Sequence, residues 1–228
     1  MNVTWLTQGG FLFERNGFRM VVDPYMSDSL AGKVTRIAAF PLPLDALRPD
    51  AVLCTHDHLD HLDPETILML SERYPESLYA APERGFRHLA ELGIAAPRLL
   101  KRETPDAFGP FNVTPVFARH SDPSAVGLLV DDSECKIYLT GDTEYDKNLF
   151  SAFTAGSDVL LICINGRLGN MTWEDAVRTA AALKPKAAIP MHYGLFAENT
   201  ANPVPFISAC QQAGIGSFEM KAGETFCV

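Results

Sequence analysis

The sequence predicts a layered α/β domain. Short runs rich in Val, Ile, Leu or Phe are bounded by Gly, Pro, Asp or Asn, and segments with a helical spacing of apolar residues lie between these runs in both halves of the chain. Because a sheet and an amphipathic helix each bury an apolar face, alternating them produces stacked layers. The 228 residues are 47% hydrophobic, and no Pro/Gly-rich linker divides them, so we expect one domain over residues 1–228.

The expected strands are short apolar runs that end at turn-forming residues. In chain order they are Val3–Leu6, Phe11–Phe13, Arg19–Val22, Ala51–Thr55, Leu78–Ala80, Asn112–Phe117, Gly127–Val130, Lys136–Thr140, Val159–Ile162, Ala187–Ile189 and Ser217–Met220.

The expected helices are Pro64–Arg73, Glu83–Leu92, Thr172–Leu183 and Val204–Ala213. Thr172 followed by Asp175 resembles a capping box at the start of the third helix. Gly214 is a suitable C-cap for the fourth. The long irregular stretch Tyr25–Leu47 lies between two strands, and because loops of this length are uncommon in compact domains and often functional, we expect a lid or an interface element.

The composition excludes several classes of partner. Nineteen Lys+Arg against 28 Asp+Glu give a formal charge of −9, and no basic run offsets it, so nucleic acid is not expected as a partner. No apolar stretch approaches the roughly 20 residues of a membrane helix. The N-terminal segment lacks the pattern of a signal peptide. Five scattered cysteines without a CxxC pair fit reduced thiols, so we expect a cytoplasmic protein with a small-molecule substrate and no membrane partner.

The main chemical signal is the segment His56-Asp57-His58-Leu59-Asp60-His61, directly after the apolar run that begins at Ala51. On a turn that leaves a strand, His56 and His58 can converge on one ion, while Asp60 and His61 point at a second. Imidazole and carboxylate donors suit Zn²⁺, Mn²⁺ or Fe²⁺. The competing interpretation is a polar surface loop rich in histidine, but three of the six histidines in one hexapeptide argue against chance.

Three further polar residues follow β-rich runs: His120, Asp142 and His192. Taken singly, each is more often a structural histidine or a turn residue. Together they place five of the six histidines near strand ends, where loops gather into a site. The sixth, His88, lies within a helical pattern and is interpreted as a structural or surface residue.

This order of motifs resembles the metallo-β-lactamase superfamily, whose motifs correspond here to Asp23, the His56–His61 segment, His120, Asp142 and His192. The resemblance implies a four-layer αββα sandwich with the metals at one edge between the sheets. It also implies that His56, His58 and His120 hold one ion, that Asp60, His61 and His192 hold another, and that Asp142 bridges them. The cofactors would be one or two divalent ions, Mn²⁺ or Zn²⁺.

A narrower resemblance connects the segments THDHLDHLDPET, LTGDTEYD, CINGRLGNMT and IPMHYGLFAENTANP to the L-ascorbate-6-phosphate lactonase group. It implies a hydrolase that uses a metal-bound hydroxide on a small anionic lactone, and a homo-oligomer. The implied substrate-binding residues are Asn165, Arg167, Asn170, Tyr193 and Asn199. Members of that group are longer chains, so the exact substrate stays open.

The remaining roles follow from the same resemblance. Asp60 and Asp142 are the expected catalytic carboxylates, Asp23 is expected to hydrogen-bond a ligand histidine or to be a turn residue, and Asp57 is expected to support the ligand loop or cap a helix. Arg167, Lys33 and Arg36 are candidate cations for the anionic end of the substrate, the alternative being solvated surface charges.

Other functions use the same donors. A phosphodiesterase or an amide hydrolase would share the two-metal centre. An iron-dependent oxidoreductase or a non-catalytic metal-binding protein would be of a different class. Metal content and a substrate panel discriminate among them.

Overall fold

The computed structural model describes residues 1–227. The strands are β1 (Asn2–Trp5), β2 (Phe11–Arg15), β3 (Phe18–Val22), β4 (Ala51–Leu53), β5 (Leu78–Ala81), β6 (Arg98–Leu99), β7 (Asp106–Phe108), β8 (Phe111–Phe117), β9 (Val126–Asp131), β10 (Lys136–Leu139), β11 (Val159–Cys163), β12 (Ala187–Met191) and β13 (Thr225–Cys227). The helices are α1 (Leu44–Leu47), α2 (Pro64–Arg73), α3 (Glu83–Glu91), the 3₁₀ helix η1 (Lys147–Leu149), α4 (Trp173–Leu183) and α5 (Val204–Gln212).

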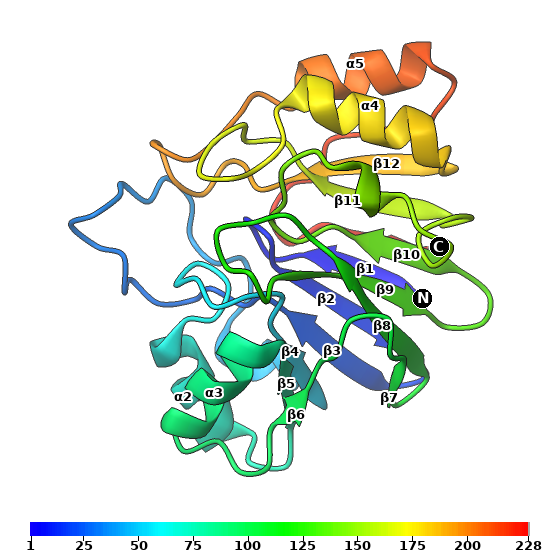
Figure 1. The fold of residues 1–228 in the computed structure, drawn as a ribbon. Helices are drawn as coiled ribbons and strands as arrows, with labels where there is room; N and C mark the ends of the chain where they lie inside the picture. The colour runs from blue at the N-terminus through cyan, green and yellow to red at the C-terminus, as the bar shows by residue number, and fades with distance from the viewer. Residues whose placement is uncertain (228) are drawn as a thin grey trace.

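These elements form the predicted αββα layers. A seven-stranded sheet, β13-β1-β2-β3-β4-β5-β6, faces a six-stranded sheet, β12-β11-β10-β9-β8-β7. Helices α2 and α3 lie on the outer side of the first sheet, and α4 and α5 on the outer side of the second (Figure 1). Each sheet combines antiparallel strands with a parallel set, namely β3 to β6 in the first and β10 to β12 in the second.

The alternation of side chains along β2 shows how one strand separates two cores. Phe11 and Phe13 are fully buried in the large core between the sheets. Leu12 points the other way and joins the core under α2, which includes Ile67 and Leu70. This two-residue period is the one expected of a strand with both faces covered.

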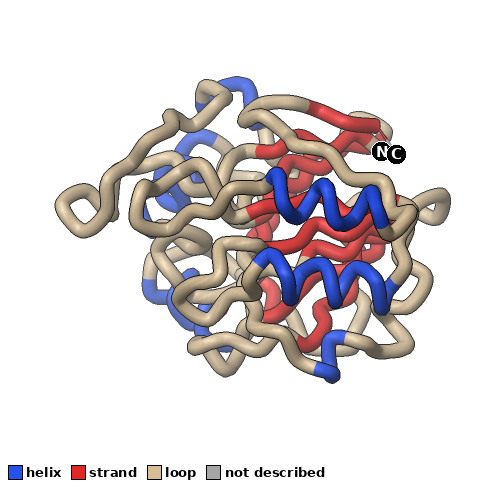
Figure 2. The backbone as a smooth tube through the Cα atoms, turned by 90° about the horizontal axis from the view of Figure 1, so that it is seen from above, coloured by secondary structure: helices blue, strands red, loops and turns tan. Residues whose placement is uncertain are grey.

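The parallel sets determine where a site can form. The carboxyl ends of β3 and β4 in one sheet, and of β10, β11 and β12 in the other, lie at one edge of the sandwich. Figure 2 shows the long loops gathered at one end of the strands. None of the helices within residues 1–227 is long and apolar enough to cross a membrane.

Some expected elements differ from those observed. Ser217–Met220, predicted as a strand, is irregular, and pairing there is limited to a bridge between Gly216 and Ala187. The short strands β6, β7 and β13 and helix α1 were not predicted, because two to four residues carry too little periodicity to be seen. Thr172 caps α4 as predicted, accepting a hydrogen bond from the Asp175 N–H at 3.3 Å.

Candidate metal centre

The loop after β4 carries four of the expected ligands: His56, His58, Asp60 and His61. The loop is a compact turn, because the His58 carbonyl accepts hydrogen bonds from the N–H groups of His61 at 2.9 Å and Leu62 at 2.7 Å. Helix α2 begins directly afterwards, where the Asp63 side chain accepts a hydrogen bond from the Thr66 N–H at 3.1 Å. The sequence therefore holds these four side chains between a buried strand end and a capped helix.

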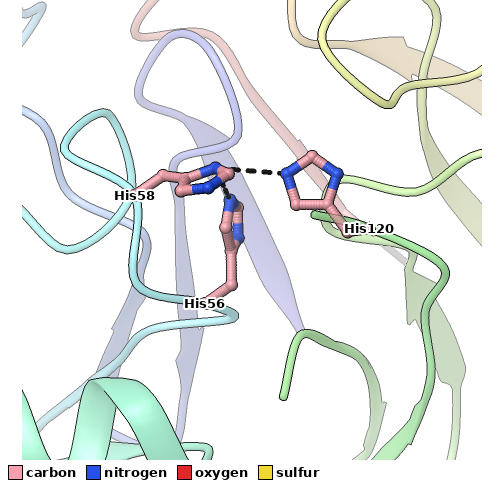
Figure 3. A group of neighbouring side chains, drawn as sticks. All are labelled: His56, His58 and His120. Atoms are coloured by element: carbon pink, nitrogen blue, oxygen red, sulfur yellow. Dashed lines mark hydrogen bonds between the residues drawn. The ribbon is translucent and has the colours of Figure 1, made fainter. Parts of the chain in front are cut away.

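His56, His58 and His120 form the first ligand group. His120 comes from the loop after β8, on the other sheet. The His56 Nε2 atom lies 3.0 Å from His58 Nδ1, and His120 Nε2 lies 3.1 Å from the same nitrogen. Figure 3 shows the three imidazoles pointing toward one another. All three ligand nitrogens lie within 4.8 Å of one another.

Asp60, His61 and His192 form the second ligand group. His192 follows β12 directly and has a left-handed backbone, with φ of 65°. Its Nε2 atom lies 3.3 Å from His61 Nε2 and 3.6 Å from Asp60 Oδ2. His61 and His192 are fully buried. The ligand atoms of this group also lie within 4.8 Å of one another.

Asp142 lies between the two groups. One carboxylate oxygen, Oδ1, is 3.1 Å from His192 Nε2 and 3.4 Å from His61 Nε2. The other, Oδ2, is 4.0 Å from His120 Nε2 and accepts a hydrogen bond from the Asn170 side-chain amide at 2.8 Å. A single carboxylate thus reaches both ligand groups, and Asn170 holds its orientation.

The outer ring nitrogens of His56 and His61 have defined partners. His61 Nδ1 lies 2.8 Å from an oxygen of Asp23, which is an acceptor, so this nitrogen carries the hydrogen. The Thr55 hydroxyl donates to Asp23 at 2.6 Å and therefore accepts from His56 Nδ1 at 3.0 Å. When each ring is neutral, its inner nitrogen, Nε2, therefore presents a lone pair to the site.

His120 follows the same pattern. Its Nδ1 lies 3.0 Å from the Gly169 carbonyl oxygen, so Nδ1 donates and Nε2 presents a lone pair to the site. His58 turns its ring the other way: its Nε2 contacts the Ser121 hydroxyl at 3.3 Å, and its Nδ1 faces the site. His192 Nδ1 is buried without a partner in the described residues.

Lone pairs that converge at about 3 Å repel one another unless a cation lies between them. The three imidazole nitrogens of the first group and the nitrogen and carboxylate donors of the second satisfy this condition in geometry and chemistry. Tetrahedral or higher coordination by such donors is what Zn²⁺ and Mn²⁺ require. Buried ligand histidines whose outer nitrogen is tied to a carboxylate or a carbonyl are typical of metal sites. The residues therefore fit a divalent metal centre.

Two histidines of the first group, His56 and His58, are held neutral. Burial lowers the pKa of His56 well below its usual value, and the neighbouring His61 lowers it further. Burial also lowers the pKa of His58, as does the proximity of His120. A neutral imidazole is the form that binds a metal ion, so this part of the site needs little deprotonation before an ion enters.

In the second group, neighbouring charges outweigh the effect of burial on the pKa values. Burial alone would lower the pKa of His61, but Asp142, Asp23 and Asp60 outweigh it and raise the pKa well above its usual value. Burial alone would raise the pKa of Asp142, yet His192 and His61 lower it well below its usual value. This half of the centre is therefore rich in negative charge and attracts a cation.

A cavity of about 520 Å³ opens beside the ligands. It is lined by Leu30, Val34, His58, Leu59, Asp60, Ser121, Asp142, Leu168, Phe196 and Asn199. Leu30 and Val34 come from the loop that was expected to be a lid or an interface element. Because members of both ligand groups line it, the cavity is the candidate substrate pocket.

The expected pocket residues are distributed differently from the prediction. Asn199 lines the cavity. The Asn165 amide donates to the Asn199 side-chain oxygen at 2.7 Å and so orients it from behind. Asn170 holds Asp142, as described above, and is buried. Asn165 and Asn170 therefore support the site through Asn199 and Asp142, and their expected direct role in substrate binding stays a prediction.

Tyr193 belongs to the core. Its ring lies 4.8 Å from the Trp5 ring, and its hydroxyl donates to the Met220 carbonyl at 3.1 Å. Burial raises the pKa of this phenol above its usual value. The Tyr193 side chain is therefore engaged in core contacts, and its expected role in substrate binding stays a prediction.

The three expected cations do not line the cavity. Arg36 is paired with Asp28 at 2.9 Å within its own loop. Arg167 donates to the Glu198 carbonyl at 3.0 Å from an exposed position, and Lys33 is exposed. Both arginines make contacts within the protein, and the expected contacts of the three cations with an anionic substrate stay a prediction.

Asp57 contributes to the shape of the ligand loop without facing the ligands. Its carboxylate is paired with His88 at 2.6 Å, and its backbone N–H donates to Asp122 at 3.0 Å. His88 is thus a structural residue on α3. Asp122 is buried and also accepts hydrogen bonds from the Ser124 N–H and hydroxyl at 2.8 and 2.7 Å.

Gln8 is a site residue that sequence reasoning missed. Its side-chain amide donates to Asp60 Oδ2 at 3.0 Å, and its carbonyl accepts hydrogen bonds from the His192 N–H at 3.0 Å and the Trp5 indole at 3.1 Å. Gln8 is fully buried with a left-handed φ of 50°. The turn Thr7-Gln8-Gly9-Gly10 was the available signal, but nothing local links it to a residue 184 positions away.

Comparison with known proteins agrees with this geometry. A UPF0173 metal-dependent hydrolase of Methanopyrus kandleri is 28% identical over 94% of this chain and 94% of its own length. One from Caldivirga maquilingensis is 26% identical over 96% of this chain and 95% of its own length. The structure of Igni18, a metallo hydrolase from the archaeon Ignicoccus hospitalis, superposes with a TM-score of 0.82 at 21% identity, covering 99% and 97% of the two chains.

The family model described as "Beta-lactamase superfamily domain" matches residues 18–193, a segment that contains the whole expected ligand set. The αββα layers and the donor groups at the edge between the sheets are those expected for the metal-binding branch of that superfamily. The chain therefore belongs to the β-lactamase superfamily and has the metallo-β-lactamase fold.

Proposed function

We propose that the protein is a metal-dependent hydrolase that opens a cyclic ester, a lactone, with two divalent ions, Zn²⁺ or Mn²⁺, at the ligand cluster. The observation that carries the proposal is the convergence of two donor groups beside one open cavity, with Asp142 between them. The relatives named metal-dependent hydrolases support the reaction class.

The ligands have separate tasks in this proposal. His56, His58 and His120 would hold one ion, and Asp60, His61 and His192 the other, with Asp142 shared. When bound, such ions supply Lewis acidity and a water that is reactive at neutral pH. The chain's own residues determine the rest of the chemistry: they fix the donors, shape the cavity and move the proton.

Asp60 is the group that we assign to proton transfer. It lines the cavity, and one of its oxygens is fixed by the Gln8 amide at 3.0 Å. A carboxylate held beside a bound water accepts the proton released as the carbonyl carbon is attacked, and returns it to the leaving alkoxide. Asn170 fixes Asp142 in the same way, so neither carboxylate has to reorganise during the reaction.

The lining of the cavity bears on a phosphodiesterase but does not separate a lactonase from an amide hydrolase. Within the described residues, neither Lys nor Arg lines the cavity, so the counter-charge for a phosphodiester would have to come from the metal ions alone. An amide hydrolase would use the same centre and is separated from a lactonase by assay alone. An iron oxidoreductase would bind redox-active iron at these donors.

The test is a panel of lactones, aryl esters, amides and phosphodiesters, assayed with wild type and Asp142→Asn, with Zn²⁺ and Mn²⁺ supplied separately. We expect lactone hydrolysis by the metal-loaded wild type and a loss on the order of a thousandfold in the variant, because the shared carboxylate is lost. Hydrolysis that ignored both the metal and the substitution would contradict the proposal. Turnover of phosphodiesters alone would replace lactones as the substrate class.

A further inference from the structure

The wall of the cavity differs in character from its floor. The floor consists of ligand side chains: His58, Asp60 and Asp142. Five apolar side chains, here called the wall, also line the cavity: Leu30, Val34, Leu59, Leu168 and Phe196. The remaining lining residues are Ser121 and Asn199. One cavity therefore combines a reactive polar end with an apolar end, as expected for a substrate with the same two parts.

The wall is built from segments that are fastened together. Phe196 is buried and packs edge-on against Tyr25, with ring centroids 5.5 Å apart. Leu30 and Val34 pack against the same small core. The backbone N–H and hydroxyl of Thr35 donate to the Glu198 carboxylate, both at 2.8 Å. The loop over the site is thus held in place by the turn that follows β12.

An apolar side chain also stands at the rim of the cavity. Leu168 is 76% exposed and occupies a left-handed position with φ of 53° in the loop before α4. Its loop neighbour Arg167 is turned away to the Glu198 carbonyl at 3.0 Å. The loop therefore contributes a leucine to the lining of the cavity, whereas the neighbouring Arg167 is not among the lining residues.

The charges of the side chains that line the cavity disfavour an anionic group in this wall. Within residues 1–227 the lining contains two carboxylates, Asp60 and Asp142, and no Lys or Arg side chain. Placing a phosphate against Leu, Val and Phe side chains would remove its water without a replacement partner, which is costly. An alkyl group of the substrate would instead gain free energy from burial there.

We propose that the apolar wall binds the uncharged alkyl chain of an alkyl-substituted lactone, which replaces the phosphorylated sugar lactone as the expected substrate class. This inference rests on the proposed hydrolytic function. The lactone carbonyl lies at the ligand end and the alkyl chain extends along Leu59 and Phe196 toward Leu168. Length of the chain, rather than charge, is the basis of selectivity.

The first experiment measures kcat/KM of metal-loaded wild type for γ-butyrolactone, γ-hexalactone and γ-octalactone, with phosphogluconolactone as the charged comparison. Each methylene that the wall buries is expected to raise kcat/KM by about fourfold. Phosphogluconolactone is expected to be the poorest substrate. A series without dependence on chain length, or with phosphogluconolactone preferred, would overturn the inference and leave the lactonase proposal standing.

A pair of variants tests whether the wall causes the dependence of kcat/KM on chain length. Leu168→Arg puts a cation at the rim of the cavity and is expected to flatten the chain-length dependence and to improve relative activity on phosphogluconolactone by tenfold or more, on the order of one charge-assisted contact. Leu68→Arg makes the same change of charge on the exposed face of α2, away from the cavity, and is expected to behave as wild type. If the two variants had the same chain-length dependence and the same relative activity on phosphogluconolactone, the proposal that the wall binds the alkyl chain would be contradicted.

Binding without turnover separates this inference from the proposed function. The lactams 2-pyrrolidinone and 5-butyl-2-pyrrolidinone are the counterparts of γ-butyrolactone and γ-octalactone. Calorimetry of the metal-loaded wild type is expected to show that the butyl compound binds at least tenfold more tightly. That result, with no lactone hydrolysed, would refute the lactonase proposal while supporting the apolar wall. Equal affinity for the two lactams would refute the proposal that the wall binds the alkyl chain.

Discussion

The two ligand groups differ in charge although they are built at the same edge of the sandwich. The first consists of three imidazoles, and burial lowers the pKa of His56 and His58. The second includes Asp60, and carboxylates raise the pKa of His61 against the effect of burial. Donor sets of these kinds favour different ions, since imidazoles suit Zn²⁺ and carboxylates also accept Mn²⁺. The two positions are therefore expected to fill independently.

The largest effects are expected from removing one ligand of each group. His120→Ala and His192→Ala should each lose one ion per chain, and each should reduce kcat/KM on the order of a thousandfold, because both ions take part in the reaction. Plasma emission on dialysed protein counts the ions. His88→Ala is the matched control, since His88 pairs with Asp57 outside the cluster and should keep both ions. A His192→Ala protein with two ions would remove the distinction between the groups.

A smaller effect is expected from Asp23, which lies behind the second group. Asp23→Asn weakens the acceptor for His61 Nδ1 and should lower the affinity of that ion by about ten- to a hundredfold. Competition with a chromophoric chelator measures the two affinities separately. An equal loss of affinity for both ions would contradict this expectation. It would mean that Asp23 also supports the first group, through Thr55 and its contact with His56.

Gly169 provides a way to disturb the first group without touching a ligand. A Cβ at this position would lie 2.9 Å from His120 Nδ1, and the residue has φ of 87°. Gly169→Ala should displace the His120 ring and lower the affinity of the first ion by about tenfold, as loss of a supporting contact does. Gly93→Ala is matched in backbone strain, with φ of 82° and no atom within 4 Å, and should leave metal affinity unchanged.

The smallest effect is expected in stability. Hydrogen bonds from Asp57 and Ser124 outweigh burial and lower the pKa of Asp122. A carboxyl whose pKa is lower in the folded state stabilises the fold above its unfolded pKa of about 3.9 and loses this contribution as the pH falls through the folded value. Asp122→Asn should therefore cost about 1–3 kcal/mol at neutral pH, and less below pH of about 4. Urea unfolding of both proteins at several pH values gives the difference; a constant difference would contradict this role.

Local patterns in the sequence were sufficient for much of the fold. Helix α2 begins and ends at the predicted residues, because Asp63 caps a segment that starts with proline. The donors of the His56–His61 segment are brought together by one turn, and spacing alone indicates this. In contrast, β13 exists only through its pairing with β1, more than 200 residues away along the chain, so its three residues carry no signal of their own.

The environment of the site could not be predicted in the same way. Whether Tyr193 faces the pocket or the core depends on the backbone conformation of His192, and a motif does not specify that. Gln8, in the turn after β1, reaches Asp60, in the loop after β4 of the same sheet, only once the sheet has formed. The cavity wall joins Leu30 and Phe196 through tertiary packing, so nothing in the sequence indicated that apolar side chains from distant segments line the cavity beside the ligands.

The central claim is that two groups of donors hold two divalent ions. Anomalous diffraction from crystals of the protein grown with Zn²⁺, and separately with Mn²⁺, tests it most directly. We predict two peaks, one bounded by His56, His58 and His120 and the other by Asp60, His61 and His192, with Asp142 between them. Absence of a peak at either group, or peaks only at surface positions, would contradict the account.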